Sequence, residues 1–306
     1  MIKFVPHNEI NKHAWEECIN NSINALIYAN SWYLDIVCPN WNAVIVDDYK
    51  AVFPLPSRTK LGIKYIYPPF FVQQLGLFFT EEKYNTENFI KLCLNEIPEE
   101  YKLVEIYLNE KNLITPDINC KIKNRKTYLL DLKENHEIIQ KNYTKGLKGK
   151  IKKTQQDNIE LINTDQPDKL INLFRENTGN NLNKFKEEDY LILHNLTNEC
   201  IKRNSAEITL AYLDNELLAG GIFLYYKNRI TYLFSAASPQ GKKYAAISLL
   251  LHHVIKEHSQ KNYIFDFEGS MVESIAKFFR SFGSSESVYL HLKMNRLPRL
   301  LRWLKD

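Results

Sequence analysis

The stretch from Arg229 to Gly283 constrains the fold more than any other part of this sequence. It reads as strand, loop, helix, strand, loop and helix, the last helix ending at Gly283. A strand that is followed by a glycine-containing loop and a helix favours the binding of an anion, because the free N–H groups and the dipole of the helix point into the loop. The expected elements are strands at 229–235 and 263–267, helices at 244–258 and 272–282, and a loop at 236–243.

Two further strands precede this stretch. They are expected at 208–213 and 217–226, with turns at Asp214-Asn215 and Lys227-Asn228. Asparagine tolerates positive φ, so these pairs between apolar runs indicate hairpins. Hairpins followed by strand, helix and strand predict a mixed sheet with helices packed on it.

The N-terminal part of the chain shows the same order of elements without clear sequence identity. We interpret this as an ancient duplication of one domain type; the alternative is that an α/β chain produces such a run by chance. The loop at 68–76 carries prolines, Phe70 and Phe71 where a phosphate site would need small residues, so the first copy is expected to lack a working site. Its elements are expected at 41–46, 51–55, 63–67, 86–95 and 103–108.

Composition places the chain among globular proteins of a reducing compartment. The apolar fraction is 44%, the charged fraction 25% and the formal net charge +4, which permits an anionic partner without requiring one. The five cysteines are scattered, which argues against a disulfide framework or a zinc site. No apolar N-terminal run or membrane-length segment occurs, so we expect a cytoplasmic protein.

One pair of motifs resembles a known family. The sequence Gln-Gly-Lys-Lys-Tyr-Ala at 240–245 is followed by Phe-Asp-Phe-Glu-Gly-Ser at 265–270 and Phe-Phe-Arg-Ser-Phe-Gly at 278–283. This order resembles the GNAT superfamily of N-acetyltransferases, in its FemAB-like branch, well over about 126–293 and in outline before that. The resemblance implies an α/β protein of two tandem GNAT-like domains, each a mixed, mostly antiparallel sheet flanked by helices. The first, 1–123, would be non-catalytic, and the second, 124–306, would carry the acyl-donor cleft.

The resemblance also implies a binding site for the donor. Gln240 and Gly241 match the start of the family's pyrophosphate loop, but the second glycine of that loop is Lys243 here. Lys242 and Lys243 could meet phosphate as point charges, or could form an ordinary exposed basic turn. Ser235, at the end of the preceding strand, and Tyr244 complete the expected donor-binding set.

Two carboxylates end the strand at 263–267. Strand alternation places Asp266 and Glu268 on one face, roughly 6.5–7 Å apart. A partly buried carboxylate there could accept a proton from an attacking amine, and Glu268 is the better candidate because it is nearer the loop. The alternative is that Glu268, together with Ser270, caps the following helix.

The usual proton donor of the superfamily is missing from the motif. Many relatives carry a tyrosine four residues before the closing glycine, and this position is Phe279 here. Either Tyr232, Ser235 or another group replaces it, or positioning of the substrates suffices. We therefore expect Glu268, Asp266 and Tyr232 as catalytic candidates.

The resemblance implies acyl transfer to an amine by a bacterial enzyme without a metal. The donor would be an acyl-coenzyme A or an aminoacyl-tRNA, and the acceptor a small-molecule or cell-wall-precursor amine; the oligomeric state stays open. Lysines cluster between 141 and 153, where they could contact phosphates, as of a tRNA, or form a solvated face. A rival reading is a degenerate GNAT-like module that binds a ligand or partner, favoured by Phe279 and Lys243.

Overall fold

The computed structural model describes residues 1–116, 120–179 and 185–298. The chain forms two compact units: unit 1 comprises 1–125 and 288–306, and unit 2 comprises 126–287. The expected second domain, 124–306, differs from unit 2 at its C-terminal end. The reason is that β14 (Ser285–Asn295) pairs antiparallel with β7 (Tyr101–Tyr107) of unit 1, from His291 opposite Tyr107 to Asn295 opposite Leu103.

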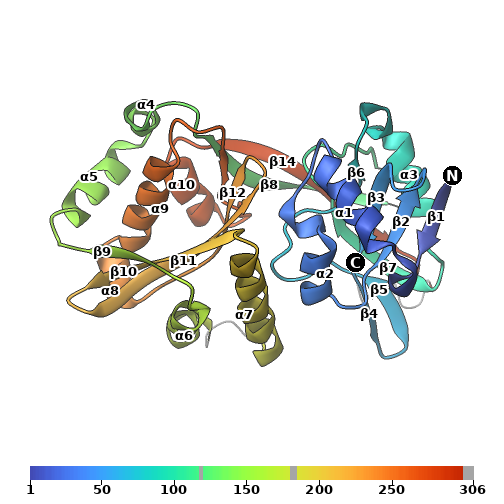
Figure 1. The fold of residues 1–306 in the computed structure, drawn as a ribbon, viewed down its shortest axis with the longest axis horizontal. Coiled ribbons are helices and arrows are strands. Elements are labelled where there is room, and N and C mark those ends of the chain that lie inside the picture. Colours follow the sequence, from blue (N-terminus) through green and yellow to red (C-terminus); the bar gives the residue numbers. More distant parts are fainter. Residues whose placement is uncertain (117–119, 180–184, 299–306) are drawn as a thin grey trace. The chain divides into compact units, whose positions relative to one another are not determined.

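Unit 1 contains two groups of strands (Figure 1). One has the order β1-β2-β3-β6, and in the other β4, β5, β7 and β14 are neighbours. Its core includes Phe53, Phe79 and Val104, all fully buried, and Leu292 of β14 belongs to the same cluster. The remaining strands are β1 (Ile2–Val5), β2 (Asn42–Val46), β3 (Ala51–Leu55), β4 (Ser57–Lys60), β5 (Ile63–Ile66) and β6 (Phe78–Phe79).

The helices of unit 1 are short, and two of them, α1 and α3, begin at polar side-chain caps. Asn11 accepts a hydrogen bond from the N–H of Ala14, and Thr86 accepts one from Phe89, which satisfies N–H groups that a helix leaves unpaired at its start. The helices are η1 (His7–Glu9), α1 (Lys12–Asn21), η2 (Ile27–Ala29), α2 (Ser31–Val37), η3 (Glu82–Tyr84) and α3 (Glu87–Asn95).

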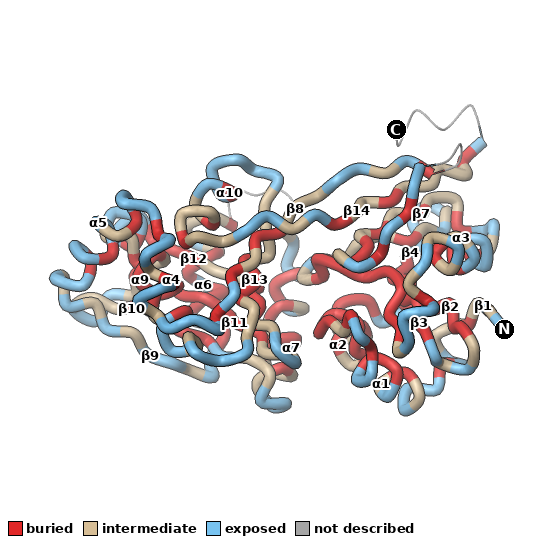
Figure 2. Tube along the Cα trace, turned by 90° about the horizontal axis from the view of Figure 1, so that it is seen from above, coloured by how far each residue is buried: buried red, intermediate tan, exposed pale blue. Residues whose placement is uncertain are grey.

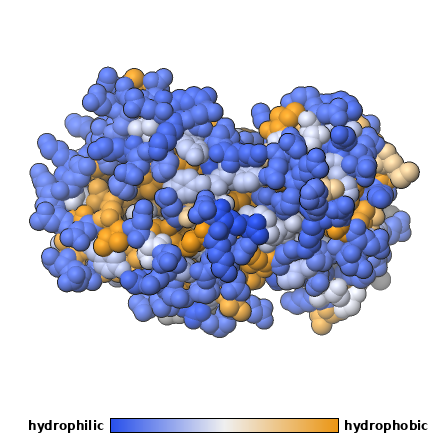
Figure 3. All heavy atoms as spheres, viewed as in Figure 1, coloured by the Kyte–Doolittle hydropathy of each residue, from blue (hydrophilic) through white to orange (hydrophobic). Residues whose placement is uncertain are grey.

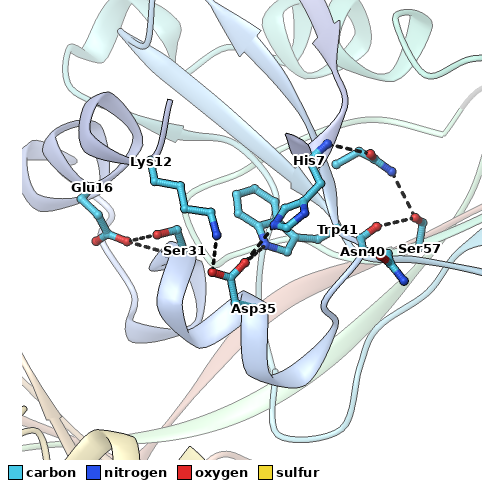
Figure 4. Close-up of polar contacts among 9 residues, drawn as sticks. His7, Lys12, Glu16, Ser31, Asp35, Asn40, Trp41 and Ser57 are labelled. Carbon is cyan, nitrogen blue, oxygen red and sulfur yellow. Dashed lines mark hydrogen bonds and ion pairs between the residues drawn. The ribbon is translucent and has the colours of Figure 1, made fainter. Parts of the chain in front are cut away.

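A polar network joins these helices to the strands of unit 1 (Figure 4). Oδ1 of Asp35 lies 2.9 Å from Nε2 of His7 and accepts a hydrogen bond of 2.9 Å from Nε1 of Trp41, and Lys12 pairs with Oδ2. These hydrogen bonds outweigh the effect of burial, so the pKa of Asp35 is lowered and its carboxylate stays ionised. The network fixes α1 and α2 against β2.

Unit 2 is built on one mixed run of strands with the order β8-β13-β12-β11-β10-β9. Only β12 and β13 pair in parallel, and the other neighbours are antiparallel. Asp214, Asn215 and Lys227 adopt positive φ, as the two expected hairpin turns require. The strands are β8 (Lys121–Asp131), β9 (Glu160–Thr164), β10 (Ala206–Leu213), β11 (Glu216–Tyr226), β12 (Arg229–Ala237) and β13 (Ile264–Asp266).

Helices cover both faces of this sheet (Figure 1). On one face, Ile139, Leu147, Leu250 and Phe279 bring α4, α5, α9 and α10 into a single buried cluster. On the other, Phe174 of α6 packs on Phe234 of β12, with 4.8 Å between ring centroids. The helices are α4 (His136–Lys141), α5 (Lys145–Thr154), α6 (Pro167–Asn177), α7 (Glu187–Lys202), α8 (Pro239–Lys243), α9 (Ala246–Glu257) and α10 (Glu273–Arg280).

Burial follows these layers. The central strands of unit 2 are mostly buried, whereas the outer turns of α5 are exposed (Figure 2). Hydrophilic residues cover most of the molecular face drawn in Figure 3. Lys145, Lys150, Lys152 and Lys153 are exposed, while Leu147 and Ile151 face the core. Helix α5 is therefore amphipathic, and these lysines of the cluster lie in solvent.

The two units share a pattern of strand pairing. In unit 1, β5 pairs in parallel with β7, and the connection between the two strands contains α3. Strand β14 lies antiparallel beside β7. In unit 2, β12 pairs in parallel with β13, and the connection between the two strands contains α9. Strand β8 lies antiparallel beside β13. Three antiparallel strands also recur, as β1-β2-β3 and β10-β11 with β9. The expected mixed sheets and repeated order of elements are confirmed.

The core of unit 2 contains a buried histidine, which leads to a prediction about acid stability. His252 of α9 is 4% exposed, and its ring lies 4.7 Å from that of His136. Desolvation by burial lowers the pKa of His252 to about 4, and the charges of His136, Lys256 and His253 act in the same direction. Because the folded pKa lies below the unfolded value of 6.5, its contribution to stability is complete above pH 6.5 and lost as the pH falls toward 4.

We expect the free energy of unfolding to fall by about 3 kcal/mol over this range from His252 alone. Urea unfolding at pH 7 and pH 4.5 measures the loss. His252→Gln should reduce it, whereas the same change at the half-buried neighbour His253 should leave it in place. An equal acid sensitivity in wild type and His252→Gln would show that other groups control it.

Candidate active site

The strands β12 and β13 diverge after three residue pairs. They pair in parallel at Arg229–Ile264, Ile230–Phe265 and Thr231–Asp266. Strand β13 then ends, while β12 continues to Ala237 and stays paired with β11 on its other side. The prediction that both strands lie in one sheet is confirmed. The segment 232–237 of β12 therefore has β11 as a neighbour on one side and is no longer paired with β13 on the other.

A β-bulge interrupts β12 in this segment. Phe223 of β11 pairs with Tyr232, but the preceding residue, Ile222, pairs with Phe234, so Leu233 is an extra residue. Phe234 consequently faces α6, and Ser235 returns to the face of Tyr232, whose hydroxyl it contacts by a side-chain hydrogen bond. Bulges commonly redirect side chains next to active sites. The bulge thus brings together two of the predicted site residues.

Tyr232 is a buried phenol that keeps its proton. It is 7% exposed, and its ring stacks on that of Phe223 at 5.5 Å between centroids. Burial raises the pKa of Tyr232 above its ordinary value, although the hydrogen bond from Ser235 acts in the opposite direction. A phenol with a raised pKa stays protonated throughout the physiological range.

Phe279 lies in the core, as its sequence position in an amphipathic helix requires. Its ring stacks on Phe267 at 5.1 Å and lies edge-on to Tyr232 at 6.4 Å between centroids. Phenylalanine offers no proton, so of the two neighbouring aromatic side chains only Tyr232 could supply one.

Asp266 is placed differently from the sequence prediction. Its carboxylate is 1% exposed and accepts hydrogen bonds from Arg229 (2.7 Å), Thr127 (2.6 Å) and the backbone N–H of Glu268 (2.9 Å). A buried carboxylate whose oxygens accept three hydrogen bonds is not exposed to an incoming amine. The geometry therefore gives Asp266 a structural role in place of the expected proton transfer.

Glu268 lies in a turn and not in the strand, so the expected alternation with Asp266 is wrong. Strand β13 ends at Asp266, and Glu268 and Gly269 have φ of 54° and 44°. Ser270 takes the part that the capping alternative gave it: the N-cap residue of α10 is Val272, whose N–H donates to the hydroxyl of Ser270 at 2.9 Å. Glu268 is partly exposed and remains the candidate base.

The predicted anion loop contains a short helix of its own, α8. Ser238 caps it by accepting a hydrogen bond from the N–H of Gly241 at 2.9 Å. A Cβ at Gly241 would lie 2.0 Å from the carbonyl oxygen of Leu218, so glycine is required for α8 to pack on β11. Gln240, Lys242 and Lys243 are exposed along α8.

The long helix begins two residues later than expected, at Ala246. Ala245 adopts a left-handed φ of 52°, and no side chain of the described residues caps α9. Tyr244 is partly exposed, and its carbonyl accepts a hydrogen bond of 2.7 Å from Thr154 at the end of α5. The first N–H groups of α9, with Lys242 and Lys243 just before them, provide the donors that the expected anion site needs.

Several residues of this region were missed by sequence reasoning. Arg229 and Thr127 hold Asp266, and Thr154 fixes the junction between α8 and α9. These contacts join segments far apart in sequence, so no local pattern signals them. Ser238 followed by Pro239 is a helix-start signature and could have predicted α8.

The corresponding loop of unit 1 is held in an unusual conformation. Phe71 has φ of 64°, and its carbonyl accepts a hydrogen bond of 2.5 Å from the hydroxyl of Tyr33. At the end of the loop, a Cβ at Gly76 would lie 2.2 Å from Oδ1 of Asn112. The loop at 68–76 thus carries bulky side chains, whereas the corresponding loop of unit 2, at 236–243, contains a glycine. We retain the proposal that unit 1 lacks a donor site.

Comparison with known proteins gives one family match and several structural matches. Residues 141–270 match the family described as an acetyltransferase (GNAT) domain. No curated protein matches the chain significantly. FemX has a similar solved structure, with a TM-score of 0.68 and 13% identity over 97% of this chain and 99% of FemX.

Two further solved structures are similar over nearly their whole length. A tandem GNAT protein from the clavulanic acid biosynthesis pathway gives a TM-score of 0.53 and 11% identity, over 97% of this chain and 99% of its own. L-PGS from Bacillus licheniformis gives 0.54 and 14%, over 94% and 93%. At sequence identities this low, the structural similarity shows a common fold alone.

Proposed function

We propose, for a chain that has the fold of the FemAB-like branch of the GNAT superfamily, that unit 2 transfers an acyl or aminoacyl group to an amine. The resemblance and the fold class are confirmed by the match over 141–270 and by the similarity to FemX and a tandem GNAT protein. Acyl transfer in general is the chemistry that this fold supports. The donor, the acceptor and the roles of individual residues are our proposals.

One observation carries the proposal: β12 and β13 separate after Thr231 and Asp266. We place the acyl group between the strand with the bulge, β12, and the turn that carries Glu268. An acyl group placed there would meet Ser235 and Tyr232 on one side and Glu268 on the other. The uncapped start of α9 would bind the phosphates of the donor.

The residues can then be given roles in a balanced reaction. The amine nitrogen attacks the carbonyl carbon of the donor, a C–N bond forms, and the C–S or C–O bond to the carrier breaks. Glu268 takes the proton that the amine loses, and Tyr232 gives its proton to the leaving thiolate or alkoxide. Ser235 orients the hydroxyl of Tyr232. The degenerate, non-catalytic alternative is less favoured, because Tyr232 offers the proton that Phe279 lacks.

The donor is either an acyl-coenzyme A or an aminoacyl-tRNA, since both present phosphates to α8 and α9. The acceptor is a small-molecule amine or an amine on a cell-wall precursor. A thermal-shift screen with acetyl-coenzyme A, charged tRNA and amino-sugar peptides separates these possibilities. A rise in melting temperature with one donor class identifies it; no shift with either would oppose the proposal.

The lysines of α8 provide a direct test of the anion site. Replacing Lys242 and Lys243 together by glutamine should weaken binding of the identified donor at least about tenfold, because two charge-assisted contacts are lost. The double change Lys202→Gln and Lys277→Gln alters the net charge equally at exposed positions of α7 and α10 and serves as the control. Isothermal titration calorimetry measures both; equal weakening would indicate only general attraction.

A further inference from the structure

The carboxylate of Asp266 connects four separate segments of unit 2. Its Oδ2 accepts a hydrogen bond of 2.7 Å from Nη1 of Arg229 on β12. Its Oδ1 accepts one of 2.6 Å from the hydroxyl of Thr127 on β8, and one of 2.9 Å from the backbone N–H of Glu268. The Arg229 and Asp266 side chains are 14% and 1% exposed. Little water therefore competes for these contacts, and the carboxylate holds the Glu268 backbone in a defined place.

The turn that carries Glu268 needs such support. The backbone of Glu268 lies in the left-handed region, with φ of 54°. Residues that carry a side chain adopt this conformation only at an energetic cost. The next residue rests on β8: a Cβ at Gly269 would lie 2.1 Å from the carbonyl oxygen of Lys126 and 2.4 Å from Cα of Thr127. Close packing fixes one side of the turn, and the Asp266 hydrogen bond fixes the other.

We infer that Asp266, itself held by Thr127 and Arg229, is a positioning residue that sets the backbone from which Glu268 reaches the acyl-transfer site. This inference rests on the proposed function of Glu268 as the base. The same carboxylate that joins β8, β12 and β13 receives the N–H of Glu268, so the ends of the diverging strands and the base are fixed relative to each other. A buried pair used only to join strands would not need that third contact, the hydrogen bond from the N–H of Glu268.

The charges of this cluster add a second expected effect. Removing the negative charge of Asp266 leaves the guanidinium of Arg229 beside the turn. A positive charge favours an ionised neighbouring carboxylate. The acidic limb of the pH–rate profile, which reports ionisation of the base, should therefore move to lower pH.

Two variants loosen the cluster by different means. Thr127→Val removes one hydrogen bond to Asp266 and preserves the shape of the side chain and the ion pair. Asp266→Asn removes the charge and preserves the size. Thr209→Val is the matched control, because Thr209 is also buried and donates a hydrogen bond of 2.9 Å to Oδ1 of Asn163, on strands distant from the turn in the sheet order.

Hydrogen–deuterium exchange tests the positioning without an activity assay. The amide of Glu268 should exchange at least about tenfold faster in Thr127→Val and Asp266→Asn than in wild type, and unchanged in Thr209→Val, because only the first two disturb its acceptor. In the acyl-transfer assay, both variants should lower kcat more than KM. Asp266→Asn should also move the acidic limb to lower pH.

The outcomes separate this inference from the proposed function. If Glu268→Gln abolishes turnover but both cluster variants match Thr209→Val in exchange and kcat, Asp266 only joins strands and the inference is wrong. If exchange at Glu268 rises in both variants while Glu268→Gln retains full activity, the cluster positions the turn but Glu268 is not the base. In that case the proposed function of Glu268 fails, and the positioning role in catalysis fails with it.

Discussion

Replacing Glu268 by glutamine is expected to lower turnover by about 10²–10⁴-fold with the fold intact. Glutamine keeps the size of the side chain but cannot take a proton from the attacking amine. Glu268 is partly exposed and lies four residues before Val272, the N-cap of α10. The substitution should therefore abolish proton transfer by this side chain and leave the packing of the core unchanged. Steady-state kinetics and a thermal melt of the same preparation measure the two effects separately.

Glu273→Gln is the matched control for this variant. Glu273 lies in the first turn of α10 and forms an exposed ion pair with Arg280. The same chemical change there should leave kcat close to wild type. Unchanged turnover in Glu268→Gln would end the assignment of the base, and an equal loss in both variants would point to a general effect on α10.

Asp266→Ala is expected to lower the free energy of unfolding by about 3–5 kcal/mol. The substitution leaves the guanidinium of Arg229 largely buried without its carboxylate and removes the acceptor of Thr127 and of the Glu268 N–H. Breaking a buried ion pair costs far more than losing an exposed one, because the remaining charge stays desolvated. Urea unfolding at pH 7 measures the change.

An exposed pair in the same unit provides the comparison. Glu286 and Lys126 lie 3.0 Å apart with both side chains partly in solvent, and Glu286→Ala should barely change stability. Replacing Asp266 by leucine and Arg229 by methionine together should recover part of the loss, since no charge is then buried alone. A small effect of Asp266→Ala, similar to that of Glu286→Ala, would contradict the role given to this pair.

Elements with a strong local pattern were predicted within a few residues. Strands β3 and β11 agree with their apolar runs, and the turn at 214–215 with its asparagine. The turn at 227–228 also forms, but there Lys227, and not Asn228, adopts the positive φ. The helix after β12 was expected as one element from Tyr244, but the chain forms α8, a left-handed Ala245 and then α9. A break of one residue leaves the apolar pattern of the longer helix intact, so hydrophobic periodicity does not reveal it.

The domain boundary shows a different kind of limit. The order of elements predicted a second domain up to residue 306, yet β14 pairs with β7 across a long sequence separation. Strand pairing depends on which edge is available in the folded chain. The sequence of β14 carries the alternating pattern of a strand but no information on its partner.

The sequence by itself determined the mixed sheets and the repeated order of elements, because these follow from periodicity and turn residues. The tertiary structure decided what each polar side chain near the end of β13 does. Asp266 and Glu268 are two residues apart, yet one is buried with Arg229 and Thr127, and the other lies in a left-handed turn after β13. Burial and hydrogen-bond partners come from β8 and β12, which are distant in sequence, and they separate a structural carboxylate from a candidate base.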